Sequence, residues 1–268
     1  MNSVRAFQNE AWGYYAKHGR DLPWRRPEHD GSFDPYKIMV SEIMLQQTQV
    51  ARVVPKYQEF LNVFPNIDVL AQATFADVLK HWNGLGYNRR AKFLLEAAKT
   101  LNKMDAFPDD PNELEKLPGI GKNTAAAICV YAYDQRHIFI ETNIRTVCIH
   151  HLFSDQTDIS DKQIVPWVEQ ALPDENYREW YWALMDYGSY LKQTISNISK
   201  RSKHYTKQSR FEGSTRQLRA AVLRSLLGGD KSMADLQSIH ADERLKSVIA
   251  SLRRDELIHE KNGKFGLN

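Results

Sequence analysis

The chain has 268 residues, a formal net charge of +3 and a hydrophobic content of 42%. This length allows one large domain or two smaller ones, and the hydrophobic content supports a substantial core. The N-terminal stretch MNSVRAFQNEAWGYYAKHGR lacks the apolar core of a signal peptide, and no run of residues approaches the length of a membrane span. We therefore expect a soluble, cytoplasmic protein.

Helical spacing or capping signals cover most of the chain up to residue 191. Short links rich in Gly, Pro or Asp, such as GSFDP and NGLGY, separate the helical segments, and there is no βαβ alternation. The pattern predicts an all-α architecture with short connections. The predicted helices are 2–18, 35–48, 51–63, 67–71, 75–81, 88–103, 113–117, 122–132, 142–153, 160–171 and 175–191.

The predicted helix 35–48 contains one carboxylate, Glu42, within the apolar run KIMVSEIML. Apolar surroundings raise the pKa of a carboxylic acid, so Glu42 can hold a proton near neutral pH and act as a general acid. A buried Glu that is paired with a lysine or an amide is the structural alternative. Gln46 and Gln47 follow, and their amides can donate to and accept from the edge of a base.

The stretch LPGIGKNTAAAICV places Gly119 and Gly121 in a tight turn between two predicted helices. It is not a nucleotide P-loop, which needs four residues between its first Gly and its Gly-Lys pair and a strand before them. Backbone N–H groups at the turn and the positive end of the second helix suit one anionic group, such as a nucleic-acid phosphate. Lys122, Asn123 and Thr124 begin that second helix. A hairpin that needs Gly only for packing is the alternative.

A second carboxylate, Glu141, ends the apolar run IFI and begins a predicted helix. In this position its side chain either caps the helix or faces a site. Thr142 or Asn143 can cap the helix equally well. Both interpretations of Glu141 therefore stay open at this point.

A basic segment follows the last predicted helix of the core. From Lys192 to Arg219 the chain carries eight Lys or Arg and one acid, Glu212, with aromatic residues such as Tyr205 and Phe211 among them. This composition is typical of a surface that follows a phosphate backbone, and it indicates a nucleic-acid partner. A solvated linker without a partner is the alternative.

The C-terminal segment from 214 to 268 predicts three helices, TRQLRAAVLRSLLGG, MADLQSI and ERLKSVIASLRRDE. The segment LIHEKNGKFGL then predicts two strands joined at Asn262 and Gly263, the favoured residues of a two-residue hairpin turn. Three helices and a hairpin describe a winged helix, which contacts either DNA or another protein. The basic residues on or near its recognition helix and wing are Lys246, Arg253, Arg254, Lys261 and Lys264.

Six segments carry a family resemblance, and they occur in family order: LPWR, PYKIMVSEIMLQQTQV, WNGLGYNRRAKFL, LPGIGKNTAAAI, IETNIRTV and ALMDYGSY. They resemble the helix-hairpin-helix (HhH-GPD) DNA glycosylases and, within them, the MutY-type adenine glycosylases. The resemblance runs from about residue 5 to residue 192. It implies a two-lobed helical core over residues 1–191, so the basic segment over 192–213 is predicted to be a linker and 214–268 the winged-helix domain.

The resemblance also implies roles for the matching residues. Glu42 matches the catalytic acid that protonates the departing base, Glu141 matches the carboxylate that stabilises the cationic sugar, and Asn143 matches the Asn of the same motif. Gln47 and Tyr87 match residues that insert into the base stack when the target is flipped out. The expected DNA contacts are Trp24, Arg25, Gln46, Gln47, Tyr87, Gly119, Gly121, Lys122, Asn123, Thr124, Lys200, Arg201 and Lys203.

The chain departs from the family pattern in ways that bear on cofactors and chemistry. Glu141 replaces the usual Asp. The four cysteines of the usual iron–sulfur cluster are missing, because the sequence contains only Cys129 and Cys148, so we expect no cluster. Asn123 stands where lyases place a Schiff-base lysine, so we expect no strong lyase activity.

Two further implications concern the hairpin and the C-terminal end. In relatives the backbone carbonyls of the hairpin hold a monovalent cation, which implies a possible Na⁺ or K⁺ site at the carbonyls of Leu117 and Gly119. We expect the winged helix to stand where the family usually has a domain that recognises 8-oxoguanine.

The leading hypothesis is a monomeric, monofunctional DNA glycosylase that removes a mispaired base, adenine first, from double-stranded DNA containing a mismatch or lesion. In a bacterium it would act at the nucleoid. One alternative is a glycosylase for a mismatched or modified pyrimidine, such as T or U opposite G. Another is a DNA-binding relative that has lost catalysis, but the presence of both Glu42 and Glu141 favours an enzyme.

Overall fold

The structure is a computed structural model that describes residues 2–153, 156–195, 198–207 and 210–268. The described chain is mostly helical, and it has a small three-stranded antiparallel sheet near its C-terminal end. The predicted fold class, a helical core followed by a small α+β part, is confirmed. Within the described residues, none of the helices combines the length and the apolarity that crossing a bilayer requires.

The chain divides into two compact units. The first unit comprises Met1–Glu42, Pro108–Lys116 and Ile120–Lys207, and the second comprises Ile43–Phe107, Leu117–Gly119 and Gln208–Asn268. The division falls within helix α2 (Pro35–Leu45): its residues up to Glu42 belong to the first unit, and its residues from Ile43 belong to the second.

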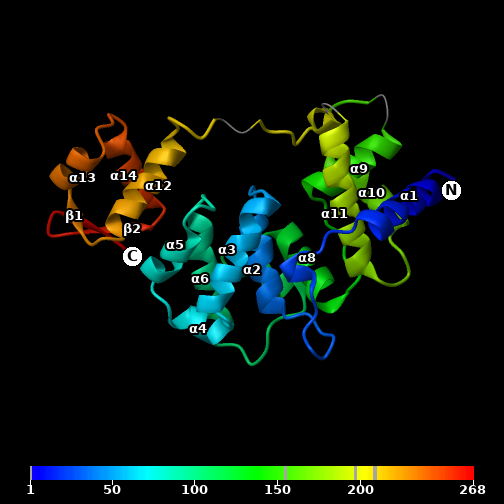
Figure 1. Cartoon of the computed structure of the whole chain (residues 1–268), viewed down its shortest axis with the longest axis horizontal. Helices are drawn as coiled ribbons and strands as arrows, with labels where there is room; N and C mark the ends of the chain where they lie inside the picture. The colour runs from blue at the N-terminus through cyan, green and yellow to red at the C-terminus, as the bar shows by residue number, and fades with distance from the viewer. Residues whose placement is uncertain (1, 154–155, 196–197, 208–209) are drawn as a thin grey trace. The chain divides into compact units, whose positions relative to one another are not determined.

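The first unit is a helical bundle in which α11 packs against both α9 and α1 (Figure 1). Its apolar centre includes Phe7, Trp180 and Tyr181, each at most 2% exposed. Its elements are α1 (Asn2–His18), η1 (Pro23–Arg25), α7 (Pro111–Leu114), α8 (Lys122–Tyr133), α9 (Thr142–Leu152), α10 (Asp161–Ala171), α11 (Tyr177–Thr194) and η2 (Ile198–Arg201), where η marks a 3-10 helix.

The second unit contains a group of helices in which α6 packs against α4 and α5, together with the C-terminal elements. Buried Phe60, Trp82 and Leu94 form part of its apolar core. Its elements are α3 (Val50–Val63), α4 (Ile67–Gln72), α5 (Phe75–Trp82), α6 (Arg89–Leu101), α12 (Thr215–Leu226), β1 (Lys231–Ser232), α13 (Met233–Ile239), α14 (Leu245–Arg254), β2 (Ile258–Lys261) and β3 (Lys264–Leu267).

Helix α2 ends at Leu45, three residues before the predicted end at 48. Gln47 adopts a left-handed conformation with φ 54°, which an α-helix cannot contain. The last carbonyls of the helix are also taken by a side chain, because Nη1 of Arg90 donates to the oxygens of Ile43 and Met44 at 2.7 and 2.9 Å. Such groups at a helix C-terminus need an external donor, and a single-segment pattern contains no sign of one.

The three helices and the hairpin predicted at the C-terminal end are confirmed. Asn262 and Gly263 both have positive φ, 53° and 71°, as the predicted two-residue turn requires. A strand that was not predicted, β1, joins the hairpin in the order β1-β3-β2, with Lys231 opposite Phe265. Two residues are too few to show the alternation by which a strand is recognised.

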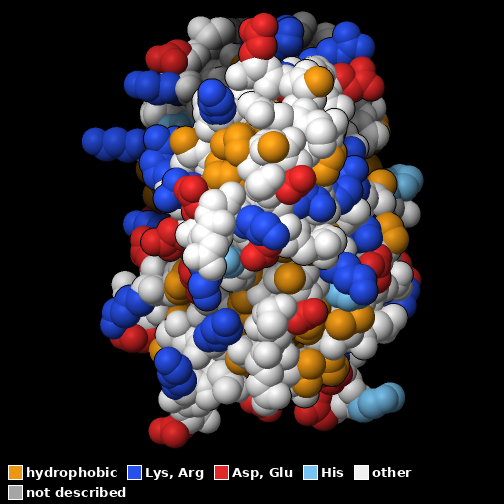
Figure 2. All heavy atoms as spheres, turned by 90° about the vertical axis from the view of Figure 1, so that its left-hand side faces the viewer, with side chains coloured by type: hydrophobic (Ala, Val, Ile, Leu, Met, Phe, Trp, Pro, Cys, Tyr) orange, Lys and Arg blue, Asp and Glu red, His pale blue; other side chains and the backbone are white. Residues whose placement is uncertain are grey.

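Charges of both signs cover the face of the molecule that lies on the side of the C-terminal helices (Figure 2). On α14 and beside it, Arg253 lies 2.6 Å from Glu260, and Arg244 lies 2.6 Å from Asp242. The predicted recognition helix is therefore not a uniformly basic surface.

The predicted basic linker, 192–213, is only partly extended chain. Its first residues complete α11, and η2 packs against α9 in the first unit. Residues 196–197 and 208–209 of this segment lie outside the described residues. The predicted three-part domain division stays a prediction.

Gly188 permits a close contact between α11 and the start of α9. A Cβ atom at Gly188 would lie 2.3 Å from the backbone oxygen of Asn143, far inside van der Waals contact. That oxygen is a backbone atom in the first turn of α9, so it cannot move away by a side-chain rotation. The N-terminal end of α9, which follows Glu141, is thus held directly against α11.

We predict that Gly188→Ala lowers the free energy of unfolding by about 1–3 kcal/mol, the range for an overpacked core, despite the better helix propensity of Ala. Urea unfolding measures this change. Gly13→Ala in α1 is the matched control, because nothing lies within 4 Å of a Cβ there. This control should be neutral or stabilising by up to about 1 kcal/mol. Equal stability of both variants would contradict the close approach.

Candidate active site

Glu42 lies on α2 among buried apolar side chains, and only 9% of its surface is exposed. Burial raises the pKa of the Glu42 carboxyl well above its usual range, and the negative charge of Glu141 raises it further. Arg25 opposes both effects without cancelling them. The raised pKa is the direction that the apolar surroundings in the sequence predicted, and a role of Glu42 as general acid stays a prediction.

Glu141 occupies the N-cap position of α9, but its side chain makes no capping hydrogen bond. Of the two interpretations left open by the sequence, the structure therefore favours a side chain that faces the site. Burial raises the pKa of Glu141, and the positive charge of Arg145 lowers it. The positive end of α9 also favours a negative charge at this point.

The two carboxyl groups influence each other, since the charge of Glu141 disfavours ionisation of Glu42. The rise in pKa is the larger at Glu42. The two groups titrate as a pair, and ionisation of both together is disfavoured. The site thus brings together two carboxyl groups whose pKa values are both raised.

Arg25 is fixed by a bidentate ion pair with Asp186 of α11, with N–O distances of 2.9 and 2.8 Å. The side chain of Asp186 is only 1% exposed, and it also accepts from Nε of Arg20 at 2.7 Å. Burial alone would raise the pKa of Asp186, but the hydrogen bonds and charges of Arg25 and Arg20 outweigh it and lower the pKa. Asp186 is thus a permanent anion that holds Arg25 in place.

Aromatic rings lie beside these charges. The Arg25 guanidinium lies 5.3 Å from the ring centre of Trp182, and Trp182 stacks with Tyr131 at a centroid distance of 6.1 Å. Burial raises the pKa of the Tyr131 hydroxyl well above its usual value, and the charges of Glu42 and Glu141 raise it further. Trp24, another expected contact, is buried in η1 next to Arg25.

The predicted turn between α7 and α8 is present, and Gly119 has φ +77°. A Cβ atom there would lie 2.6 Å from Cβ of Phe93, so both the conformation and the space require glycine. Gly121 is the N-cap of α8, and the exposed Lys122 is its first residue. The backbone N–H groups of this helix start suit an anion, as the sequence predicted.

Asn123 has a structural partner as well as its expected role at the hairpin. Its Nδ2 donates to the backbone oxygen of Ile140 at 3.0 Å. This bond ties the start of α8 to the residue that precedes Glu141. Thr124 follows in the same turn of α8, and it is half-buried.

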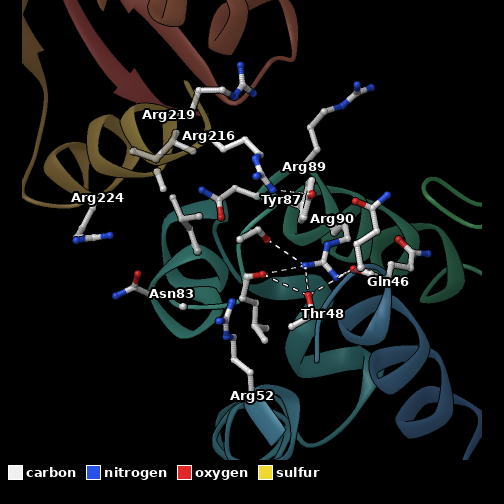
Figure 3. A pocket seen from close by; sticks show the side chains of 18 of the residues that line it. Gln46, Thr48, Arg52, Asn83, Tyr87, Arg89, Arg90, Arg216, Arg219 and Arg224 are labelled. Carbon is white, nitrogen blue, oxygen red and sulfur yellow. Dashed lines mark hydrogen bonds between the residues drawn. The ribbon is translucent and has the colours of Figure 1, made fainter. Parts of the chain in front are cut away.

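The expected base-stack residues Gln47 and Tyr87 lie in the second unit, both with positive φ, 54° and 48°. One buried side chain, Arg90, joins the loops that carry them (Figure 3). Its Nη1 donates to the oxygen of Gln46 at 2.7 Å, and its Nη2 donates to Oγ1 of Thr48 and to the oxygens of Leu85 and Gly86 at 3.0 to 3.2 Å. Burial lowers the pKa of Arg90 to about 10, so it stays charged at neutral pH.

The basic residues Lys200, Arg201 and Lys203 lie at and beside η2. Lys200 and Lys203 are exposed, whereas Nε of Arg201 donates to the backbone oxygen of Gln156 at 2.8 Å. Arg201 therefore also serves to attach this segment to the first unit. A role of the three residues in DNA contact stays a prediction.

The residues present do not fit an iron–sulfur cluster. Such a cluster needs four thiolates, and the sequence contains two cysteines. Cys129 and Cys148 are both buried, and burial raises the pKa of each thiol to about 12, so they are neutral thiols at physiological pH. In the part of the chain that the structure describes, no three His, Cys, Asp or Glu side chains gather as metal ligands. A monovalent cation at the carbonyls of Leu117 and Gly119 stays a prediction.

Three residues of the site were missed by the sequence analysis, namely Asp186, Tyr131 and Arg90. Asp186 is a lone acid in the apolar segment WYWALMDYG, the same signal that identified Glu42. Arg90 falls on the buried face of α6 with Leu94 and Ala97, where a charged residue needs a partner. Tyr131 shows no such signal, because aromatic residues in an apolar helix are ordinarily core.

Comparisons with known proteins agree with this geometry. Residues 40–170 match the family model described as HhH-GPD superfamily base excision DNA repair protein. An adenine DNA glycosylase of Buchnera aphidicola subsp. Baizongia pistaciae is 33% identical over 216 residues, which cover 77% of this chain and 60% of the relative. An adenine DNA glycosylase of Mycobacterium tuberculosis is 44% identical over 139 residues, which cover 51% of this chain and 44% of the relative. The chain thus spans less than two thirds of either relative.

Solved structures show the same fold at lower identity. A thermostable thymine-DNA glycosylase superposes with a TM-score of 0.61 at 22% identity, covering 70% of this chain and 87% of the other. A trapped endonuclease III–DNA covalent intermediate gives a TM-score of 0.60 at 18% identity, covering 70% and 86%. With the acid pair and the glycine hairpin in place, the chain is similar over residues 40–170 to the HhH-GPD superfamily base excision DNA repair proteins, and it resembles adenine DNA glycosylases.

Proposed function

We propose that the chain is a monofunctional DNA N-glycosylase that removes mispaired adenine from double-stranded DNA. The observation that carries this proposal is the pair of interacting carboxyl groups, buried Glu42 and half-buried Glu141, whose pKa values are both raised. The similarity to adenine DNA glycosylases of two bacteria supports adenine as the target. An inactive DNA-binding protein would not need two interacting acids at one site.

In the proposed reaction, Glu42 first donates a proton and later accepts one, and Glu141 stabilises the charge that develops between these two steps. The proton of Glu42 passes to a ring nitrogen of the departing base, and the N-glycosidic bond breaks with its electron pair leaving on the base. The sugar that remains is cationic, and the carboxylate of Glu141 stabilises it. The Glu42 carboxylate then accepts a proton from the attacking water, whose oxygen bonds to the sugar carbon. The acid is restored, and the products are the free base and an abasic site.

The surrounding residues hold these groups in place. Asp186 fixes Arg25, whose charge limits the rise in the pKa of Glu42 and so lets the acid release its proton. Asn143 follows Glu141 in the first turn of α9, where its backbone meets Gly188. A misplacement of about 1 Å can cost about 100-fold in rate, so this support matters for catalysis.

We further propose that the enzyme lacks strong lyase activity. The position where a Schiff-base lysine would stand holds Asn123, whose amide is bonded to the oxygen of Ile140. Lys122 is one residue earlier on α8, and one residue corresponds to a rotation of roughly 100° about a helix. The DNA strand should therefore stay intact after incubation with the protein alone, and it should break at the abasic site only after treatment with heat or alkali.

The test of the proposed function is a panel of duplexes, each with one mispair or lesion, incubated with excess protein and then treated with alkali. We expect release of adenine from at least one mispair. Release of T or U opposite G without release of adenine would show that the target base is a pyrimidine and not adenine. No release from any duplex, together with tight binding, would indicate the inactive relative.

We predict that Glu42→Gln slows single-turnover base release by roughly 100- to 10,000-fold, the usual contribution of a general acid. The amide has nearly the shape of the acid but no proton to give. Duplex affinity, measured by fluorescence anisotropy, should stay unchanged. A variant that retains the parental rate would remove Glu42 from the mechanism.

The same acid determines the expected pH dependence. Because Glu42 must be protonated and its pKa is raised, the rate should persist at neutral pH and fall as pH rises through that pKa. The residual rate of Glu42→Gln should lack this alkaline fall. The comparison separates loss of the acid from a general loss of folding at high pH.

We predict that Glu141→Gln slows base release by about 100- to 1,000-fold, as expected when a preorganised charge partner is removed. Glu141→Asp keeps the charge but shortens the side chain by one methylene, so its rate should lie between those of Glu141→Gln and the parent. Single-turnover kinetics at saturating protein measure both. If both variants match the parent, the anion that stabilises the sugar lies elsewhere.

We also predict that the purified protein is colourless and active after treatment with an iron chelator. The physical reason is that its two buried, protonated thiols cannot supply four thiolate ligands. Metal analysis and the visible absorption spectrum provide the measurement. Four iron atoms per chain, with activity that depends on them, would contradict this prediction.

A further inference from the structure

A pocket of about 860 Å³ lies within the second unit, and it is lined by arginines of the helical core and of the C-terminal domain (Figure 3). No Asp or Glu is among the described residues that line it. Its floor is apolar, with Leu79, Phe93 and Leu223, and amide side chains such as Gln46 and Asn83 stand around it. The arginines are Arg52, Arg89, Arg90, Arg216, Arg219 and Arg224.

Four of these arginines already have partners, and those of Arg89 and Arg216 are described below. Arg90 binds the backbone oxygens described above, and Arg219 of α12 lies 2.6 Å from Asp255 and 2.5 Å from Oγ of Ser251. By contrast, Arg52 on α3 and Arg224 on α12 are exposed, and no ion pair involves either one in the described part of the chain. Two guanidinium groups thus face this pocket without a neutralising acid.

Arg216 joins α12 to the loop of Tyr87. Its Nη1 donates to the Tyr87 hydroxyl at 3.0 Å, and its guanidinium lies 5.8 Å from the centre of the ring. The guanidinium of Arg90 lies 5.5 Å from the same ring. Such distances are within the range of cation–π attraction. The first helix of the C-terminal domain therefore lies beside a residue expected to enter the base stack.

Ion pairs hold the C-terminal domain in this position within the second unit. Lys92 on α6 lies 2.7 Å from Glu256, and Arg89 lies 3.7 Å from Asp255. Surface pairs of this kind contribute little to stability by themselves. Their consequence is positional, because they join the end of α14 to α6 and so place α12 beside the pocket.

We propose that α12, rather than the expected recognition helix α14, is the DNA-contacting element of the C-terminal domain. Arg216 and Arg224 of α12, with Arg52 of α3, bind backbone phosphates of the duplex next to the loops that carry Gln47 and Tyr87. This inference rests on the proposed function, since it takes duplex DNA as the ligand.

The chemistry of the pocket supports a phosphate backbone as its occupant. Guanidinium groups bind phosphate through paired, charge-assisted hydrogen bonds. Several like charges in one place repel each other, and a polyanion relieves this repulsion. On α14, in contrast, Arg253 already pairs with Glu260, which competes with phosphate. The amides around the pocket suit sugar and phosphate oxygens.

The test compares two variants with the same loss of charge from the full chain. One is Arg52→Gln/Arg216→Gln/Arg224→Gln, and the other, on α14, is Lys246→Gln/Arg253→Gln/Arg254→Gln. Binding to a mispaired duplex is measured by anisotropy over a series of salt concentrations. The pocket variant should bind at least tenfold more weakly, and its salt slope should fall by roughly 0.9 for each lost phosphate contact, about 2 to 3 in all.

The α14 variant should bind nearly like the parent. Parental affinity and salt slope in the pocket variant, or a larger loss in the α14 variant, would overturn the proposal. Because Arg216 also touches Tyr87, the double variant Arg52→Gln/Arg224→Gln separates phosphate contact from the placement of Tyr87. The salt slope of this double variant should fall by about two thirds of the amount by which that of the triple variant falls. A double variant with the salt slope of the parent would also overturn the proposal.

Two further measurements identify the ligand. A duplex with uncharged methylphosphonates beside the mispair should bind the parent more weakly and abolish the difference between parent and pocket variant. Deoxyadenosine monophosphate is the probe for a free nucleotide. If it displaces the duplex from the parent at constant ionic strength, but not from the pocket variant, the pocket is a mononucleotide site and the proposal fails.

Binding and catalysis are read separately. If no duplex releases a base while the pocket variant still binds more weakly, the proposed reaction is wrong and the DNA contact stands. If base is released while both variants bind alike, the reaction stands and the role of α12 is wrong.

Discussion

Two carboxyl groups close to each other at one site impose the constraint on which the rest of the site depends. The charge of Glu141 raises the pKa of buried Glu42, and partial loss of solvent raises the pKa of both, so ionisation of the two together is disfavoured. The proposed chemistry uses two such acids in different states, since the departing base requires a proton and the sugar a negative charge.

Neighbouring arginines limit the rise in the pKa of both acids. Arg145, which favours ionised Glu141, is itself held by Asp161 at 2.6 Å, and Arg25 is held by Asp186. Removing one member of such a buried pair would leave an uncompensated charge, which is costly in a protein interior. Gly188 extends the same support to the backbone, because its missing side chain lets α11 meet the first turn of α9.

In the second unit, buried Arg90 binds backbone carbonyl groups, whereas Arg25 and Arg145 of the first unit form ion pairs. Arg90 satisfies the last carbonyls of α2 and the loop carbonyls near Tyr87, so it determines where α2 ends and how two loops meet. Arg216 then adds a contact from α12 to the same tyrosine. A guanidinium suits this work, because its planar donors can join several acceptors at once. In the proposed account, this region contacts DNA while the first unit performs the chemistry.

The sequence by itself determined the elements and the central residues. Helical periodicity located most helices, Asn262-Gly263 located the hairpin, and a lone acid in an apolar helix identified Glu42. These signals succeed because they are local: spacing, turn conformation and nearby hydrophobicity all act within a few residues. The early end of α2, the strand β1 and the contacts of Asp186, Arg90 and Arg216 depend instead on partners far along the chain. Only the tertiary structure decided them, because burial, ion pairing and the pKa of a carboxyl group depend on which distant residues fold against it.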